Sequence, residues 1–386
     1  MESLFKTFKL LMVLGAACML LPGTISAQHY KQTNLVSDVA GAAAIQDPSL
    51  VNAWGLSRSS TSPWWVSNNG TGTSTLYTGA GAIIPINGNG IVTIPPPNGS
   101  PAGTAATPTG TVFNGSSDFV LPAPNSKPAV FIFVTEDGTI SGWNGGPSAV
   151  IAVDNSDKGS GNGAVYKGVT TAEINGKRYL YAANFRSGHI EVYDATFKRV
   201  KLSSDAFQAM GDGEGDDDNR SGNLIPYGYA PFNVQNIGGS LFVTYAKQDG
   251  QKHDDVAGDG HGFVEIYTPS GKHVRHLQHG PWLNSPWGVV WCPRDFGEFS
   301  NAILVGNFGN GWIAAYNGFT YKFIGLMKNP DDSILTIDGL WSLTFGNGAA
   351  AGPSTTLYFS AGTDHEAHGL FGSLTAVSTE QDGDEE

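Results

Sequence analysis

The 386-residue chain is poor in cysteine, in charged residues and in long apolar runs. Only 14 per cent of its residues are charged, where about 25 per cent is ordinary. Because 40 per cent are hydrophobic, the chain can still build a core, which excludes an acidic disordered protein. The net charge of −13, without a cluster of lysine and arginine, argues against a nucleic-acid partner.

The 52 glycines follow no G-X-Y period, which excludes collagen, and the composition is not that of a helical bundle. Common catalytic signatures are missing as well. The sequence contains no G-x-S-x-G nucleophile elbow, no P-loop, no H-E-x-x-H pair and no C-x-x-C. Motifs alone therefore assign no enzyme class.

The first 27 residues have the order of a secretory signal peptide. Lys6 and Lys9 precede an apolar run over residues 10–21, and small residues follow up to Ala27. We expect cleavage near Ala27 and a secreted or periplasmic protein without a membrane span. Lipid attachment at Cys18 is the alternative, although the leucine of the lipoprotein pattern stands one position too early.

Removal of residues 1–27 leaves Cys292 as the single cysteine, so no internal disulfide can form. Its position beside Trp291 in an apolar stretch predicts a buried, small hydrophobic side chain. The stability of the mature chain is then expected to come from packing.

A repeated β-hairpin organises the rest of the chain. In three places an asparagine at the end of an apolar strand is followed nine positions later by a tyrosine: Asn68 and Tyr77, Asn184 and Tyr193, Asn307 and Tyr316. Shorter or longer versions occur at residues 131–143, 241–267 and 357–374. An additional apolar strand precedes most hairpins, and a turn with one more strand follows several of them.

Six such units of about sixty residues predict an all-β fold, a six-bladed β-propeller of four-stranded antiparallel blades. Seven blades are the alternative. We expect one domain over residues 28–379, followed by an acidic tail at 380–386. Residues 32–36 are expected to supply the outer strand of the last blade and so to close the ring.

In this topology, the residues leading into each first strand and the loops after each second strand share one mouth of the central channel. The predicted ligand-binding residues at that mouth are polar: Asn52, Asn68, Asn184, Asn233, Asn307 and Asp338. Trp54, Trp287 and Trp341 stand at equivalent strand starts and are expected to pack between blades.

The two longest loops at this mouth are rich in side chains that bind metals. A divalent cation such as calcium, or a transition ion, is the cofactor that they could hold. The alternative is that they are solvated loops whose carboxylates cap turns. The candidate ligands are His253, Asp254, Asp255 and Asp259 in one loop and Asp364, His365 and Glu366 in the other.

Several segments together resemble an uncharacterised family of secreted bacterial propellers, some of which end in a PEP-CTERM sorting signal: residues 50–56, 252–256, 306–311, 337–341 and 368–374. Residues 184–193 are similar to NHL-repeat and SMP-30-like propellers. The second resemblance implies a divalent ion held by side chains such as Asn52, Asn233 and Asp338.

We therefore expect a monomeric binding module whose loop-rich mouth takes a protein, a glycan or a small ligand. The alternative is a metal-dependent hydrolase of lactonase type, with Asp338 as a metal ligand and a metal-bound water as nucleophile.

Overall fold

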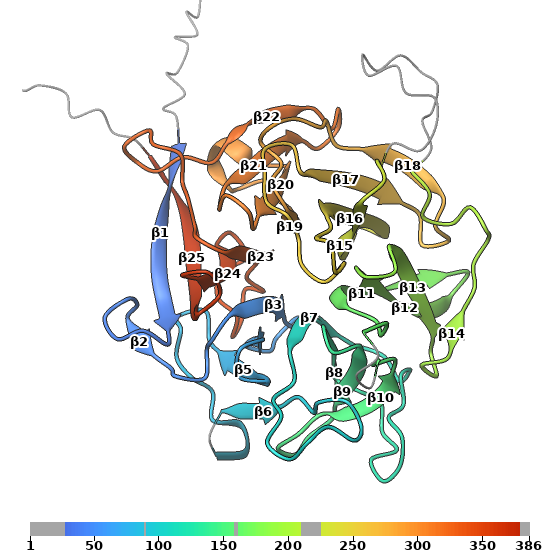
Figure 1. Cartoon of the computed structure of the whole chain (residues 1–386). Coiled ribbons are helices and arrows are strands. Elements are labelled where there is room, and N and C mark those ends of the chain that lie inside the picture. Colours follow the sequence, from blue (N-terminus) through green and yellow to red (C-terminus); the bar gives the residue numbers. More distant parts are fainter. Residues whose placement is uncertain (1–27, 89, 158–160, 210–224, 379–386) are drawn as a thin grey trace, which may run out of the picture.

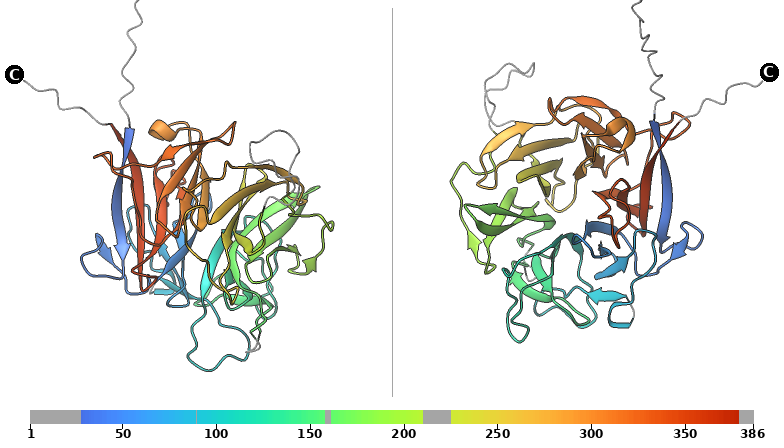
Figure 2. Two further views of the ribbon diagram at one scale, coloured as in Figure 1. Left: turned by 45° about the horizontal axis from the view of Figure 1, so that its top comes forward. Right: turned by 180° about the vertical axis from the view of Figure 1, so that it is seen from behind.

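The structure is a computed structural model that describes residues 28–88, 90–157, 161–209 and 225–378. Six antiparallel sheets stand around one axis, as Figure 1 shows from the front and Figure 2 from behind and at a tilt. The predicted six-bladed β-propeller is therefore confirmed, and the alternative of seven blades is wrong. The predicted signal peptide and the tail at 380–386 lie outside the described residues.

The first three blades each contain four strands that follow one another from the axis outward. Blade 1 contains β3 (Ala53–Ser57), β4 (Trp64–Asn68), β5 (Thr73–Tyr77) and β6 (Ile91–Thr93). Blade 2 contains β7 (Pro108–Phe113), β8 (Phe131–Thr135), β9 (Thr139–Trp143) and β10 (Val150–Asp154). Blade 3 contains β11 (Tyr166–Ile174), β12 (Lys177–Asn184), β13 (His189–Asp194) and β14 (Arg199–Val200).

The next two blades repeat this order, and the sixth blade departs from it. Blade 4 contains β15 (Tyr229–Ile237), β16 (Ser240–Lys247), β17 (Gly262–Tyr267) and β18 (His273–His276). Blade 5 contains β19 (Pro286–Trp291), β20 (Ala302–Asn307), β21 (Ile313–Asn317) and β22 (Phe323–Leu326). Blade 6 contains β23 (Leu340–Phe345), β24 (Leu357–Thr363), β25 (His368–Ser378), β1 (Gln28–Ser37) and β2 (Ile45–Gln46).

Strand β1 closes the ring. It pairs antiparallel with β25 along its whole length, from Gln28 opposite Ser378 to Ser37 opposite Leu370. The outer strand predicted at residues 32–36 is thereby confirmed. The structure adds one element, because the chain turns back after β1 and β2 joins its end as a short parallel fifth strand.

Each blade packs both of its faces against a neighbour. In β20, Ile303 and Val305 join a hydrophobic cluster shared with blade 4, whereas Leu304 between them joins the cluster shared with blade 6. This alternation follows from the two-residue period of a strand. Six such clusters separate the six blades, and a seventh, of mostly aromatic side chains, occupies the centre of the ring.

Cys292 lies in the cluster between blades 5 and 6 and is 1% exposed, as expected for a small hydrophobic side chain. Burial raises the pKa of its thiol, so the side chain is an unreactive packing group. Helical structure in the described chain is limited to the short η1 (Ile86–Gly88) and η2 (Gly297–Phe299). No helix among these residues is long and apolar enough to cross a membrane.

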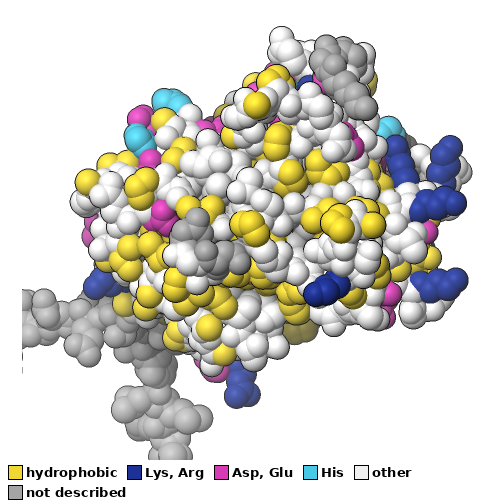
Figure 3. Space-filling model, turned by 90° about the horizontal axis from the view of Figure 1, so that it is seen from below, with side chains coloured by type: hydrophobic (Ala, Val, Ile, Leu, Met, Phe, Trp, Pro, Cys, Tyr) yellow, Lys and Arg dark blue, Asp and Glu magenta, His cyan; other side chains and the backbone are white. Residues whose placement is uncertain are grey.

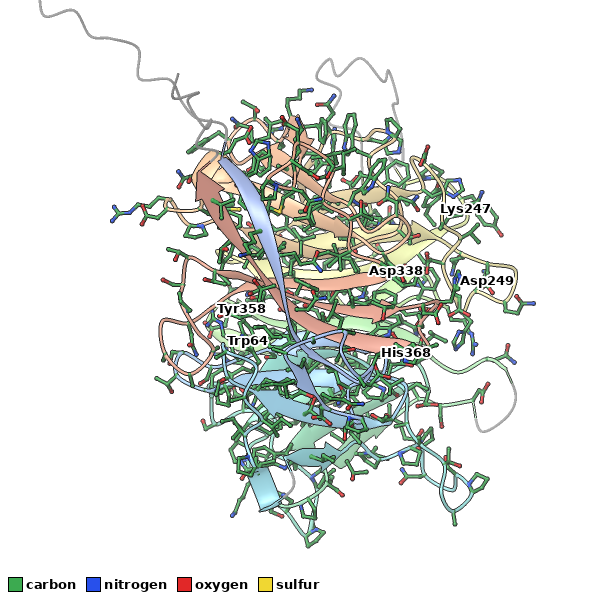
Figure 4. All side chains as sticks on the ribbon, turned by 90° about the vertical axis from the view of Figure 1, so that its left-hand side faces the viewer. Trp64, Lys247, Asp249, Asp338, Tyr358 and His368 are labelled. Atoms are coloured by element: carbon green, nitrogen blue, oxygen red, sulfur yellow. The ribbon has the colours of Figure 1, made fainter. Side chains whose placement is uncertain are left out.

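The two faces of the ring differ in their loops. Seen from the side, Asp338, His368, Lys247 and Asp249 lie toward one face, and Trp64 and Tyr358 lie toward the other (Figure 4). The residues leading into the first strands and the loops after the second strands therefore meet at one mouth, as predicted. Charged side chains are sparse on the side of the ring that Figure 3 shows, which reflects the low charge of the sequence.

Tyr30 of β1 should contribute strongly to the stability of the closed ring. It is fully buried, stacks on Phe299 with 5.7 Å between ring centroids, and its hydroxyl donates to the carbonyl of Phe296. Tyr30→Ala should lower the free energy of unfolding by about 3–5 kcal/mol, the usual cost of deleting a buried aromatic ring. Tyr30→Phe should cost about 1–3 kcal/mol, because two buried backbone groups lose their partner. Equal losses in the two variants, measured by urea unfolding, would contradict this assignment.

Candidate functional site

The mouth of the ring is built by polar side chains that reach across from one blade to another. The Asn52 amide, before β3, donates to the Glu366 carboxylate of blade 6 at 2.6 Å. The Asn69 amide of blade 1 donates to the Glu136 carboxylate of blade 2 at 2.8 Å. These bonds bring segments that are 314 and 67 positions apart in sequence to one rim.

A buried lysine lies at the centre of this rim. Lys167 belongs to β11, the innermost strand of blade 3, and its side chain is 2% exposed. Its ammonium contacts the Glu136 carboxylate and lies 3.3 Å from an oxygen of Asp254, which belongs to blade 4. Burial alone would lower the pKa of Lys167, but the two negative charges outweigh this effect and the pKa is raised. Lys167 is therefore a permanent cation at the mouth.

Aromatic rings lie beneath the ammonium and fill the centre of the propeller. Lys167 Nζ is 5.1 Å from the ring centroid of Trp54, which in turn stacks on Trp341 at 3.4 Å. Trp287 packs edge-on against both, and its indole donates to the backbone carbonyl of Lys167. The packing role predicted for the three tryptophans is confirmed by their burial. A cation above aromatic faces is stabilised by the ring quadrupoles.

Further carboxylates surround the lysine. Burial raises the pKa values of Asp255 and Glu366. A hydrogen bond with His253, supported by the charge of Lys167, lowers the pKa of Asp254 to about 2, and the same bond raises the pKa of His253. The mouth is therefore acidic around one fixed positive charge.

Three of these groups could hold a cation together. Glu136, His253 and Asp254 each offer a ligand atom, and the three atoms lie within 4.8 Å of one another. Imidazole and carboxylate ligands suit a transition ion better than calcium, which prefers oxygen alone. Two of the three already contact the Lys167 ammonium, so an ion here would compete with that ammonium for the same charges.

The loop that carries Glu366 is held in an uncommon conformation. Asp364, His365 and Glu366 have φ values of 52°, 54° and 67°, in the left-handed region that side chains other than glycine seldom adopt. Such residues persist where their surroundings fix them. Here the Asp364 amide donates to the Asp338 carboxylate, and Glu366 is held by Asn52.

A cavity of about 620 Å³ opens beside the lysine, between blades 2 and 3. It contains three carboxylates, one guanidinium and hydroxyl groups, and the loop over residues 97–101 forms one wall. Its polar lining includes Glu136, Asp137, Asp157, Arg186, Ser100, Ser156 and His253. The loop belongs to a segment of the chain that is rich in proline and glycine.

Asp137 is a cavity carboxylate that Thr107 holds in place. One of its oxygens accepts hydrogen bonds from the backbone amide and the hydroxyl of Thr107, at 2.7 and 2.9 Å. Burial nevertheless raises its pKa. Arg186, across the cavity, donates to the carbonyl of Gly163 and lies 3.9 Å from Asp157. The cavity is therefore lined by hydrogen-bond acceptors, such as the Asp137 carboxylate, and by a hydrogen-bond donor, the Arg186 guanidinium.

Most of the asparagines predicted to face a ligand make bonds within the protein. Three of them form hydrogen bonds within their own hairpin. These bonds join Asn68 to Thr73 and Thr75, Asn184 to Ser187 and Glu191, and Asn307 to Trp312. Asn233 donates to the carbonyl of Trp287. The ligand contacts predicted for these residues and for Asp338 stay predictions.

The predicted metal ligands divide into three groups. His253 and Asp254 lie together with Glu136, which the sequence places only in a loop at the mouth. Asp255 and Glu366 are half-buried near Lys167, whereas Asp259, Asp364 and His365 are exposed.

Lys167 is a central residue of the mouth that was not predicted from the sequence. The signal that could have indicated it is a single lysine within the apolar segment at residues 165–169.

The fold and this mouth define a β-propeller with a charged, lysine-centred channel. No family model matches the chain. It is 30% identical over 355 residues to the uncharacterised protein L690 of Acanthamoeba polyphaga mimivirus, covering 89% of this chain and 85% of that protein. The uncharacterised protein R648 of the same virus is 28% identical, with 89% and 80% covered. The chain belongs to the family of L690. These relatives are viral, whereas the sequence resemblance pointed to bacterial proteins.

Solved structures agree in fold alone. A protein of unknown function from Bacteroides thetaiotaomicron superposes with a TM-score of 0.50 at 9% identity, covering 91% of this chain and 76% of that chain. A streptogramin B lyase reaches 0.49 at 11% identity, with 91% and 98% covered. The GH93 α-L-arabinofuranosidase of Fusarium graminearum reaches 0.48 at 11% identity, with 90% and 98% covered.

The ion pair at the mouth should be important for stability. Lys167→Met leaves the Glu136 carboxylate, whose side chain is 10% exposed, without its cation, and should cost about 3 kcal/mol in urea unfolding. Lys167→Met combined with Glu136→Gln should recover at least half of that loss, because the buried charge of Glu136 is removed together with its partner and Asp254 is 64% exposed. Arg178→Gln, which breaks the exposed pair with Glu173, should cost less than about 1 kcal/mol and serves as the control. A double variant no more stable than Lys167→Met would refute this role.

Proposed function

We propose that this propeller is a binding protein, and that its ligand is a small hydrophilic molecule rich in hydrogen-bond donors. The observation that carries the proposal is the cavity of about 620 Å³ with Glu136, Asp137 and Asp157 in its wall. Ligand pockets commonly have volumes of about 300–1,000 Å³. Ionised carboxylates only accept hydrogen bonds, so they select ligands with hydroxyl or ammonium groups.

The burial of Asp137 supports this proposal. A carboxylate with a raised pKa in a cavity costs stability, and such groups gather at functional sites. Arg186 supplies the one guanidinium in the lining and could pair with an acceptor of the same ligand. Lys167, behind Glu136, fixes the position of that carboxylate through their ion pair.

Asp137→Asn should separate binding from folding. The amide oxygen can still accept both bonds from Thr107, and the buried charge is gone. Because the pKa of Asp137 is raised on folding, this carboxyl favours folding below its unfolded value of about 3.8, and that benefit is lost as the pH rises. At pH 7 the variant should therefore melt at a higher temperature than the natural protein, and the difference should shrink toward acidic pH.

The same variant tests the ligand. We expect a panel of mono- and disaccharides and small amines to contain compounds that raise the melting temperature of the natural protein but not of Asp137→Asn or Arg186→Gln. Asp295→Asn, an exposed change on blade 5, should respond like the natural protein. Ligands that stabilise all four proteins equally would place the site elsewhere.

A metal-dependent hydrolase of lactonase type is the second candidate, and the Glu136, His253 and Asp254 cluster favours it. It agrees with the sequence resemblance to SMP-30-like propellers, whose metal position corresponds to this mouth. Hydrolysis of a lactone that requires an added divalent ion and disappears in Glu136→Gln would support this candidate over simple binding. The Lys167 ammonium at the same carboxylates favours the binding protein.

We further propose that the protein is secreted or periplasmic and works as a monomer, in keeping with the resemblance to secreted propellers. Strand β1 begins at Gln28, directly after the predicted cleavage position, so cleavage there would keep all of the ring-closing strand. Expression of the full chain in a bacterium should yield an exported form whose N-terminal residue is Gln28. An exported form modified with lipid at Cys18 would support the lipoprotein alternative, and a form retaining Met1 in the cytosol would refute export.

A further inference from the structure

A second cluster of metal-binding side chains lies on blade 4, outside the mouth. Glu265 belongs to β17, and His273 and His276 belong to β18, the outermost strand of that blade (Figure 1). Each of the three offers a ligand atom, and these atoms lie within 4.8 Å of one another. His273 Nε2 is 2.7 Å from an oxygen of Glu265.

A register shift brings the two histidines together. His273 and His276 are three positions apart, and in a regular strand side chains at that spacing point to opposite faces. Here β18 pairs with β17 through His276 opposite Glu265 and His273 opposite Tyr267, with an irregularity between them. An extra residue in one strand re-aims the side chains that follow. Both imidazoles can therefore approach the same carboxylate.

Blade 3 contains a version of this arrangement that needs no metal. Glu191 stands two positions before Tyr193, as Glu265 stands two before Tyr267, and Arg199 faces Tyr193 as His273 faces Tyr267. The Glu191 carboxylate accepts bonds from Tyr166, Tyr193 and Asn184, and Arg199 provides a permanent cation at 3.0 Å. Blade 3 thus uses this position for structural charge pairing.

Blade 4 changes the chemistry at that position. A histidine replaces the arginine, a second histidine is added, and the hydroxyls of Tyr267 and Tyr245 bond to each other at 3.0 Å. A neutral imidazole presents a lone pair to a metal, which a guanidinium cannot do. Glu265 is only 2% exposed, so a divalent cation would compensate a charge that is costly to bury.

We propose that Glu265, His273 and His276 bind a transition-metal ion, for which Zn²⁺ is the best match. Two imidazoles and one carboxylate form a donor set typical of zinc sites with one open position, and they suit zinc better than calcium or magnesium. The site lies at the perimeter of the ring, where His273 and His276 are both partly exposed, so an ion can reach it from solvent. The site is independent of the ligand proposed for the mouth.

Titration of the chelator-treated full chain with ZnCl₂ by calorimetry tests the proposal. We expect one Zn²⁺ per chain at this site, a rise in melting temperature on binding, and a visible absorption spectrum when Co²⁺ replaces zinc. His276→Ala and Glu265→Gln should weaken Zn²⁺ binding by at least about 100-fold, beyond the 10–100-fold typical of losing a supporting contact. His189→Ala, an exposed histidine of blade 3, is the matched control and should bind as the natural protein does.

Two further comparisons make the outcome decisive. Glu136→Gln combined with His253→Ala removes the cluster at the mouth and should leave this Zn²⁺ affinity unchanged. If that double variant abolishes binding while His276→Ala retains it, the ion belongs to the mouth and the proposal is wrong. The proposal is also wrong if the natural protein binds no Zn²⁺. Melting curves without metal test whether His276→Ala is folded, and Glu265→Gln provides a second variant whose new side chain is nearly equal in size.

Discussion

The constraint on which this structure depends is that a twisted four-stranded sheet with apolar side chains on both faces cannot exist alone in water. Each blade buries one face against each of its two neighbours. In blade 5, Ile303 packs against blade 4 and Leu304 packs against blade 6. The solution is complete only when the sixth sheet meets the first. Because apolar residues along each strand alternate between the clusters on its two sides, the blades form a closed ring and not an open stack.

The ring then determines what the mouth can be. First strands converge on the axis, where six sheets leave room for a few large side chains, and tryptophan and phenylalanine rings fill it. A charge placed above these rings is removed from water and needs partners. Lys167 finds them in Glu136 and Asp254, on loops of the two adjacent blades. The same three residues therefore stabilise the loops and set the charge of the neighbouring cavity.

The fold could be predicted from the sequence because its signals are local. The spacing of nine between Asn307 and Tyr316 recurs because the asparagine ties the turn of its own hairpin. The partners of Lys167 could not be predicted in this way, since Glu136 and Asp254 are 31 and 87 positions away and no local sequence pattern relates them to the lysine. The cavity depends on the path of the loop over residues 97–101, and the histidines of blade 4 meet Glu265 only through an irregular register.

The position of β1 has a consequence for how the chain reaches this state. Among the strands that the structure describes, β1 is synthesised before all the others, and β25, with which it pairs, is synthesised after them. Until β25 is in place, both β1 and β24 present an open edge, a template for pairing with another chain. Contacts between segments that are far apart in sequence also form slowly. The eleven-residue strand β25 therefore covers the edges of β1 and β24 at the same time, so completing the fold also removes the sites where another chain could pair.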